Sequence, residues 1–455
     1  MLQVKRFNLS WQPALEVDTR ALAAMRIGLG LLSVFCAWSY RFPWTDYMDH
    51  RQPSMIPAVV VIIVMALAGV GLALGWRTRA VTVLAWLCQW KLQGQGPFLM
   101  DGADHTLRLL LFWSFFLPLG ARCSLDALRK KNQQPDSTIT LPQTFKGWGV
   151  LALRLQVCWI YWMGVLWKCG PAWWENGNAI EIALRMQAFS TEWGHWLLQF
   201  PNLLRFSTHV TVWLEIIVPA LALFPFVPAR IRAWSALTMI LFHLGMLAPA
   251  MKLGFFPWMC STAWLAFLPS CFWNWLARRF RKPPELLNES TTDLKAGWIT
   301  NTLAILSWVW IMLWTARDFG LDNTATLLPP VIEQPGIYLK LFQNWALFAP
   351  DPANTEMLIS VWGRKADGTE VPLYGVPPRS IRDEYADFRW RSLVRQSLEA
   401  KTNYWRDDLI RWFGSRSKDT DIKEVKLVVQ TFYTNVPNQA PKEKVWGWIP
   451  MTIDK

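Results

Sequence analysis

Lys168 stands where a long apolar stretch ends, immediately before Cys169 and the helix-breaking pair Gly170-Pro171. A lysine kept away from water loses the solvation of its ammonium form, and a neutral amine can act as a general base near pH 7. The alternative is a lysine that extends its ammonium group to the edge of a membrane and only marks that boundary. Lys168 is therefore a candidate catalytic base with a plain structural alternative.

A second candidate lies in Asp101-Gly-Ala-Asp-His105, which opens another apolar stretch and is followed by Arg108. A histidine beside a carboxylate can be held in one tautomer and can pass on a proton, so His105 is a candidate acid or base. The same residues also suit the polar start of a helix, with Asp104 as its N-cap.

Glu215 and His243 each lie in the middle of an apolar run. A carboxylate among aliphatic side chains must be protonated, paired or placed in a wet cavity, so Glu215 either lines a cavity or belongs to a buried structural pair. His243 is a pocket candidate too, although a histidine in such surroundings can also be a hydrogen-bonded packing residue.

Motifs of soluble enzymes are absent from the chain. There is no Gly-rich phosphate loop, no HExxH and no GxSxG, and the seven Cys include no CxxC or Cys/His spacing typical of a metal site. The sequence therefore predicts no metal and argues against ATP-driven transport. It leaves room for a lipid-soluble cofactor, which needs only an apolar cleft and a few polar groups.

The composition is that of a membrane protein. Hydrophobic residues make up 53% of the 455 residues and charged residues only 17%, against about 25% in soluble proteins. The 32 Trp suit repeated crossings of the membrane interface. The net charge of +13 comes from Lys and Arg in short clusters between apolar runs, so the lipid bilayer rather than nucleic acid is the expected partner.

Nine apolar segments are candidate membrane spans. They are 21–39, 56–75, 79–93, 105–120, 148–167, 207–226, 232–250, 254–276 and 300–316. Two are weak, because 79–93 is short and 105–120 begins with His105 and Arg108. We expect an all-α polytopic bundle of about eight or nine transmembrane helices over residues 1–316.

The distribution of Lys and Arg predicts how this bundle is oriented. The basic residues gather in alternate loops: 76–78, 121–147, 227–231 and 277–299. By the positive-inside rule these loops and the N-terminus are cytoplasmic in a multi-pass protein of the cell inner membrane. Residues 168–206 and the chain after 317 then lie on the outer, extracytoplasmic side. An amphipathic helix along the outer surface is expected at about 177–198.

Residues 317–455 predict a small extracytoplasmic α+β domain. The stretches 357–362 and 371–374 flank Asp367-Gly368, the pattern of a β-hairpin. Residues 380–413 are charged and helical in pattern, and 424–433 alternate as a further strand.

A resemblance to a known protein family rests on several short stretches and on their order along the chain. They are Leu74–Arg79, Asp101–Arg108, Phe116–Asp126, Lys168–Trp174, Glu215–Pro219, Phe242-His243 and Trp345–Pro350. In this order the chain resembles the HTTM (horizontally transferred transmembrane domain) family, whose best-known member is the vitamin K-dependent gamma-carboxylase. The resemblance covers roughly residues 15–280, with a looser similarity around 340–375.

The resemblance implies a concrete chemistry. In the carboxylase a Lys shortly before a Trp is the base for vitamin K hydroquinone, and Lys168 ahead of Trp173 matches it. His105 matches a His that assists where the glutamyl carbanion meets CO2. Glu215, His243, Trp173 and Arg108 would then help to bind the cofactor. The implied reagents are reduced vitamin K or menaquinol, O2, CO2 and a Glu in a protein or peptide.

The chain also departs from the carboxylase. Trp167 stands where that enzyme has Lys, Gly170-Pro171-Ala172 replaces acidic residues, and the outer domain is much shorter. These departures keep a second hypothesis open, a non-catalytic HTTM membrane protein that acts as a receptor, immunity factor or assembly factor.

Overall fold

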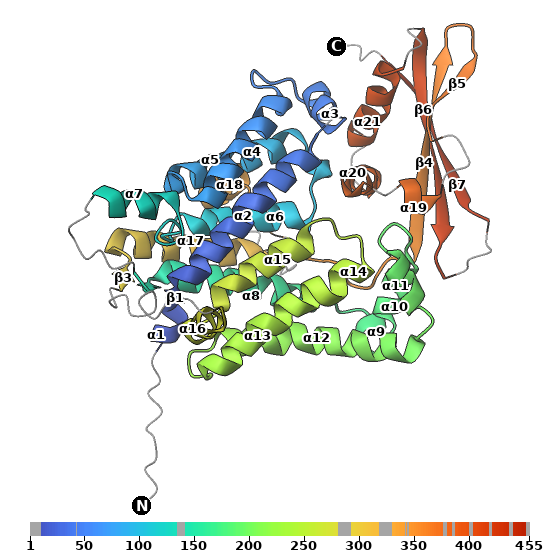
Figure 1. Cartoon of the computed structure of the whole chain (residues 1–455). Coiled ribbons are helices and arrows are strands. Elements are labelled where there is room, and N and C mark those ends of the chain that lie inside the picture. Colours follow the sequence, from blue (N-terminus) through green and yellow to red (C-terminus); the bar gives the residue numbers. More distant parts are fainter. Residues whose placement is uncertain are drawn as a thin grey trace, which may run out of the picture.

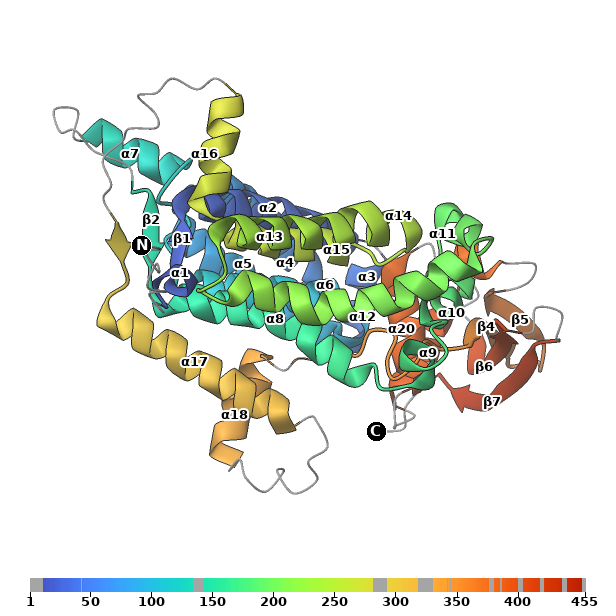
Figure 2. The same cartoon turned by 90° about the horizontal axis from the view of Figure 1, so that it is seen from below.

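The computed structural model shows a bundle of long helices with a small β-sheet domain at one end (Figure 1). It describes residues 11–41, 43–133, 142–280, 293–317, 330–341, 343, 345–375, 380–384, 387–399, 404–417, 421–435 and 440–451. Seen from below, a second, smaller sheet lies at the opposite end of the long helices (Figure 2).

The long helices pack side by side around an apolar core. They are α2 (Thr19–Ser39), α4 (Ala58–Leu74), α5 (Thr78–Gln95), α6 (Gly102–Ser114), α8 (Trp148–Trp167), α12 (Pro201–Leu223), α13 (Ala229–Leu241), α15 (Phe256–Trp264) and α17 (Trp298–Arg317). Small residues let α2 and α4 approach closely, since a Cβ on Gly30 would lie 2.4 Å from the backbone nitrogen of Ala73. Such close contacts are typical of helices packed in membranes.

Among the described residues, five helices are long and apolar enough to cross a bilayer. They are α2, α8, α12, the continuous helix Ala229–Ala250 and residues Trp298–Thr315 of α17. The helix Ala229–Ala250 joins α13 to α14 (Ala248–Ala250) through a π-helical turn, Phe242–Leu247. These helices confirm a membrane protein with several spans. The shorter α4 is apolar as well, with 17 residues.

Two of the expected spans have a different structure. The segment expected at 105–120 is a helix of 13 residues, because α6 ends at Ser114. The segment expected at 254–276 is interrupted at Leu268-Pro269, which separates α15 and a 3-10 turn from α16 (Ser270–Arg279). Proline lacks the N–H that a continuing helix needs. The expected total of eight or nine spans is therefore confirmed for five, and the other spans stay a prediction.

The start of α6 differs from expectation by one turn. Asp101, rather than Asp104, is the N-cap, and its side chain accepts hydrogen bonds from the N–H groups of Ala103 and Asp104. The Asp104 side chain in turn accepts from the N–H of Asp101 at 3.0 Å, which completes a capping box.

The segment after α8 forms three short helices instead of one amphipathic helix at 177–198. These are α9 (Pro171–Trp174), α10 (Ala179–Arg185) and α11 (Glu192–Leu197). The chain turns between α10 and α11, where Ser190 pairs with Met251 in an isolated β-bridge. Figure 1 places α9, α10 and α11 close to the sheet domain.

The C-terminal sheet has the strand order β5-β4-β6-β7, with all neighbours antiparallel. Its strands are β4 (Thr355–Lys365), β5 (Glu370–Tyr374), β6 (Ile422–Tyr433) and β7 (Lys442–Pro450). The hairpin β4–β5 turns at Asp367-Gly368, where Gly368 has φ 87°, so the predicted hairpin is confirmed. The strand predicted at 424–433 is β6.

The predicted helix at 380–413 is divided into α19 (Ile381–Glu384), α20 (Phe388–Glu399) and α21 (Tyr404–Ser415). Residues 385–386 and 400–403 of that prediction lie outside the described part of the chain. The division into residues 1–316 and 317–455 stays a prediction. Residues 318–329, which follow this boundary almost directly, are also outside the described part of the chain. Helix α18 (Pro330–Leu339) packs on α17, and the indole of Trp90 in α5 bonds the carbonyl of Tyr338.

The remaining elements are short. They are α1 (Gln12–Leu15), α3 (Trp44–Arg51), η1 (Pro97–Leu99), α7 (Leu125–Gln133), η3 (Leu265–Phe267), β1 (Glu16–Asp18), β2 (Thr144–Lys146) and β3 (Leu294–Lys295). The last three form the smaller sheet. Parts of the two longest basic loops, 134–141 and 281–292, are outside the described residues.

Candidate functional site

Lys168 forms an ion pair with Glu215 inside the bundle. Lys168 caps the C-terminus of α8, where its N–H bonds the carbonyls of Gly164 and Val165. Its Nζ donates to Glu215 Oε2 on α12, and the two side chains are only 7% and 11% exposed. The structure therefore excludes a solvent-exposed lysine at this position.

Trp173 covers the ammonium group of Lys168. Its ring centroid lies 4.9 Å from Lys168 Nζ, within the range of a cation–π contact. The Trp173 indole donates to the carbonyl of Phe348 at 2.9 Å, and the Trp174 indole donates to the carbonyl of Lys168 at 2.6 Å. Both tryptophans of α9 thus hold the end of α8 in place.

The segment 348–351 closes over this site from a distant part of the chain. The N–H of Gly170 donates to the carbonyl of Pro350 at 3.1 Å, and the N–H of Ala172 donates to Asp351 Oδ1 at 3.0 Å. A Cβ on Gly170 would lie 2.2 Å from the Asp351 carboxylate, so this contact requires glycine. Phe348 has φ 55°, a conformation uncommon outside glycine that is characteristic of constrained sites.

His243 belongs to a neighbouring group of buried hydrogen bonds. It lies in the π-helical turn, and its Nε2 is 2.7 Å from the hydroxyl of Tyr161 on α8. That hydroxyl accepts from the Trp264 indole at 2.8 Å. Within the described part of the chain, His243 Nδ1 has no hydrogen-bond partner, although it is buried. Such an orphaned polar atom is costly unless a ligand or water satisfies it.

Helix α8 carries a member of both groups. Lys168 follows Tyr161 by seven residues, about two turns of helix, so the two side chains lie on the same side of α8, which packs on α12. The His243–Tyr161 pair therefore lies about two helical turns along α8 from the Lys168–Glu215 pair. π-helical turns inside α-helices occur frequently at functional sites.

Asp104, the carboxylate that precedes His105 in the sequence, pairs with residues of other elements. Asp104 forms an ion pair with Arg389 of α20 at 2.5 Å and accepts from the Tyr40 hydroxyl at 3.2 Å. His105 Nδ1 lies 3.2 Å from Arg108 Nη2. The reason is helical geometry, since residues one apart point in different directions while residues three apart are neighbours.

His105 and Arg108 form a separate group on α6, in which Arg108 also bonds the side chain of Gln93 on α5. Among the described residues, no hydrogen bond or ion pair joins this group directly to Lys168 or Glu215. The structure thus brings Lys168 together with Glu215 and Trp173, His243 together with Tyr161, and His105 together with Arg108.

Several buried polar residues were not foreseen. Tyr161 and Gln156 lie in the apolar run that ends at Lys168. The Gln156 side chain donates to Gln343 Oε1 at 2.7 Å, and the same oxygen accepts from the Trp345 indole. Their position inside an apolar run is the signal that could have identified them. No cluster of three or more His, Cys, Asp or Glu able to hold a metal occurs in the described ranges.

Comparison with known proteins places this arrangement in a family. No curated protein and no solved structure matches the chain. A comparison with protein families matches the HTTM domain to residues 16–275, more than half of the chain, and this range contains Lys168, Glu215 and His243. The chain therefore belongs to the HTTM family.

Proposed function

We propose that this chain is a membrane-embedded, quinol-dependent enzyme of the vitamin K-dependent carboxylase type. The observation that carries the proposal is the buried Lys168–Glu215 pair under Trp173. Buried ionisable pairs inside a membrane are costly and are functional candidates by default. The resemblance to the vitamin K-dependent carboxylase suggests the chemical class.

The pair can act as a single base. Lys168 and Glu215 are together neutral, either as ammonium and carboxylate or, after proton transfer between them, as amine and carboxylic acid. Uptake of one proton from a bound hydroxyl leads from either form to the same state, an ammonium beside a carboxylic acid. That state carries one positive charge, which stabilises the anion left by the deprotonated hydroxyl.

The neighbouring residues fit a hydroquinone. The unpartnered Nδ1 of His243 offers one hydrogen-bonding atom for a second hydroxyl, and Trp173 offers an aromatic face. Reduced vitamin K or menaquinol, with O2, would supply the strong base that removes a γ-proton from Glu before CO2 is added. The residues of the bundle would exclude water from that base.

His105 and Arg108 take a different part in this proposal. They lie on α6, and the family resemblance implies that His105 assists where the glutamyl carbanion meets CO2. We therefore assign them to that step, which must lie within reach of the base formed from the quinol.

Purified protein in lipid, with reduced menaquinone or vitamin K hydroquinone and O2, tests the proposal directly. Quinone epoxide should form, and labelled CO2 should enter a Glu-containing peptide. Lys168→Ala and Glu215→Gln should each reduce epoxide formation at least a hundredfold, in the range expected for loss of a general base. Lys91→Ala, a lysine bonded to Ser54 elsewhere in the bundle, is the matched control and should retain activity. Equal background-level epoxide in wild type and Lys168→Ala would exclude the enzyme.

A second candidate function is that of a non-catalytic receptor, immunity factor or assembly factor. It is favoured by the closure of segment 348–351 over Lys168, because a fully covered ion pair can also be purely structural. Wild type without epoxidase activity, together with a large stability loss in Lys168→Ala, would support this function.

We further propose that the chain is a multi-pass protein of the inner membrane with a cytoplasmic N-terminus, an extracytoplasmic sheet domain and about eight or nine spans. The sheet domain and the smaller sheet lie at opposite ends of the bundle (Figure 2). This separation supports an extracytoplasmic position for the sheet domain. Reporter fusions at the C-terminus, active only outside the cytoplasm, would test the orientation.

A further inference from the structure

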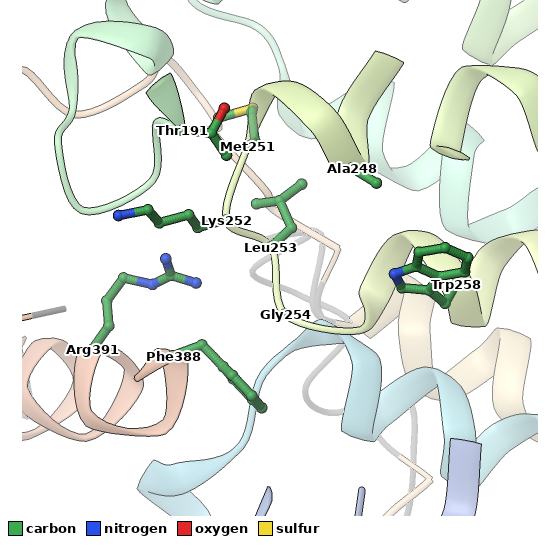
Figure 3. A pocket seen from close by; sticks show the side chains of 9 residues that line it. All are labelled: Thr191, Ala248, Met251, Lys252, Leu253, Gly254, Trp258, Phe388 and Arg391. Atoms are coloured by element: carbon green, nitrogen blue, oxygen red, sulfur yellow. The ribbon is translucent and has the colours of Figure 1, made fainter. Parts of the chain in front are cut away.

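A cavity of about 320 Å³ lies between the helical bundle and the sheet domain. The link from α14 to α15, which contains Lys252, Leu253 and Gly254, forms one wall, and Phe388 and Arg391 of α20 form another (Figure 3). Its volume is within the range of sites that hold a small molecule or a headgroup.

Two cationic side chains stand on the same side of this cavity (Figure 3). Arg391 is buried, donates to the carbonyl of Ala188 at 2.7 Å and stacks on the Phe189 ring at 4.0 Å. The Lys252 side chain has no hydrogen bond or ion pair with any described residue. Burial, and then the nearby guanidinium of Arg391, lower the pKa of Lys252. Like charges held this close are stabilised by an anion between them.

The nearest carboxylates are engaged elsewhere. Asp383 and Glu356 act on Lys252 in the opposite direction to Arg391, but neither lines the cavity. Glu356 accepts from the N–H of Ala188 at 2.7 Å, and Asp383 accepts from the hydroxyl of Ser380 at 2.6 Å. The cavity itself therefore has cationic side chains and no anionic one in its described lining.

The side of the cavity away from the two cations is apolar. Ala248 and Trp258 lie there, Met251 and Leu253 lie between them and the cations, and 53% of the Trp258 surface is exposed (Figure 3). Trp258 belongs to the first turn of α15, and tryptophans at the ends of membrane helices mark the headgroup level. The cavity thus joins a charged side, at Lys252 and Arg391, to an apolar side, at Ala248 and Trp258.

We propose that this cavity binds the anionic headgroup of a membrane lipid, with its phosphate between Lys252 and Arg391 and its apolar part along Met251 and Trp258. The cavity is distinct from the Lys168 site. Phe189, on which Arg391 stacks, contacts Phe348 at 5.3 Å between ring centroids, and the Trp173 indole bonds the carbonyl of Phe348, so two residues separate Arg391 from Trp173 along this path. The proposal is independent of whether the chain is an enzyme.

Native mass spectrometry of the full-length protein in detergent tests this site. Titration with phosphatidylglycerol should give saturable binding, and phosphatidylcholine should bind at least tenfold more weakly. Lys252→Gln should weaken phosphatidylglycerol binding about tenfold, as expected for the loss of one charge-assisted hydrogen bond. Lys423→Gln, at an exposed lysine of the sheet domain, is the matched control and should bind like wild type.

Two results would overturn the proposal. Equal phosphatidylglycerol affinity in Lys252→Gln and Lys423→Gln would show that the cavity does not hold the headgroup. Displacement of the lipid by an equal concentration of glycerol phosphate would show a site for a free anion, in which the tail plays no part. Because Lys252 has no partner in the described structure, its replacement should leave thermal unfolding unchanged, so lost binding cannot reflect misfolding.

Discussion

Arg389 of α20 and Asp104 of α6 form an ion pair in which neither side chain has any exposure to solvent. The Arg389 guanidinium contacts both carboxylate oxygens, at 2.5 and 3.0 Å, and also bonds Ser39 and the carbonyl of Leu99. One arginine therefore joins the C-terminal part of the chain to two helices of the bundle.

Removing one partner of this pair should destabilise the protein strongly. Arg389→Met leaves the Asp104 carboxylate buried without its counter-ion, at a cost of about 3–5 kcal/mol. Denaturant unfolding in detergent measures the change in the free energy of unfolding. Arg364→Met is the matched control, because Arg364 pairs with Glu424 at 2.9 Å with both side chains over a third exposed. That change should cost less than about 1 kcal/mol. Equal effects of the two changes would contradict the prediction.

A double-mutant cycle on Lys168 and Glu215 should separate their structural and chemical roles. Lys168→Met and Glu215→Met each leave one buried charge unpaired, so each should destabilise the fold by about 3–5 kcal/mol. The double variant should recover most of this loss, because neither charge remains. If the pair is also the base of an enzyme, the double variant should be folded and inactive. Recovery of epoxide formation together with stability would show that the pair has only a structural role.

Gly170 should be intolerant of even a methyl group. Gly170→Ala places a Cβ within 2.3 Å of all three carboxyl atoms of Asp351, so segment 348–351 must move away. Overpacking of this kind typically costs about 1–3 kcal/mol, and here it should also uncover Lys168. Thermal unfolding and protease sensitivity measure the two effects. Gly297→Ala is the control, because nothing lies within 4 Å of its Cβ, and an equal loss there would refute the steric explanation.

Much of the fold could be predicted because it depends on local pattern. The hairpin β4–β5 follows from alternating apolar residues on either side of Asp367-Gly368, and α8 and α17 follow from long apolar runs. The interruption at Leu268-Pro269 was missed, although its proline was visible in the sequence. Strand β7 was missed as well, because Lys442 to Val445 are all exposed and show no alternation of burial.

The site itself could be predicted only in part. Lys168 and Glu215 each stand out as ionisable residues bordering or inside apolar runs, but they are 47 residues apart, and only the packing of α8 on α12 pairs them. The partner of Asp104 is still more distant, 285 residues away in a charged helix where an arginine is unremarkable. Sequence patterns identify residues that need a partner, whereas tertiary packing decides which partner each one obtains.

Glu356 should make the stability of the sheet domain depend on pH. Burial raises the pKa of this carboxyl above its ordinary 4.5, against the opposing effect of its hydrogen bond from the N–H of Ala188. The folded state therefore holds the proton more tightly than the unfolded state does. Its stabilising effect is complete below pH 4.5 and is lost as the pH rises through the higher, folded pKa.

Glu356→Gln should remove this dependence, since the amide oxygen can still accept from Ala188 and carries no charge at any pH. The free energy of unfolding of wild type, relative to that of the variant, should fall as the pH is raised from 4 towards neutrality. Glu424→Gln is the control, at a carboxylate over a third exposed on the neighbouring strand. A wild-type profile parallel to that of Glu356→Gln throughout this range would show that the buried carboxyl does not titrate with folding.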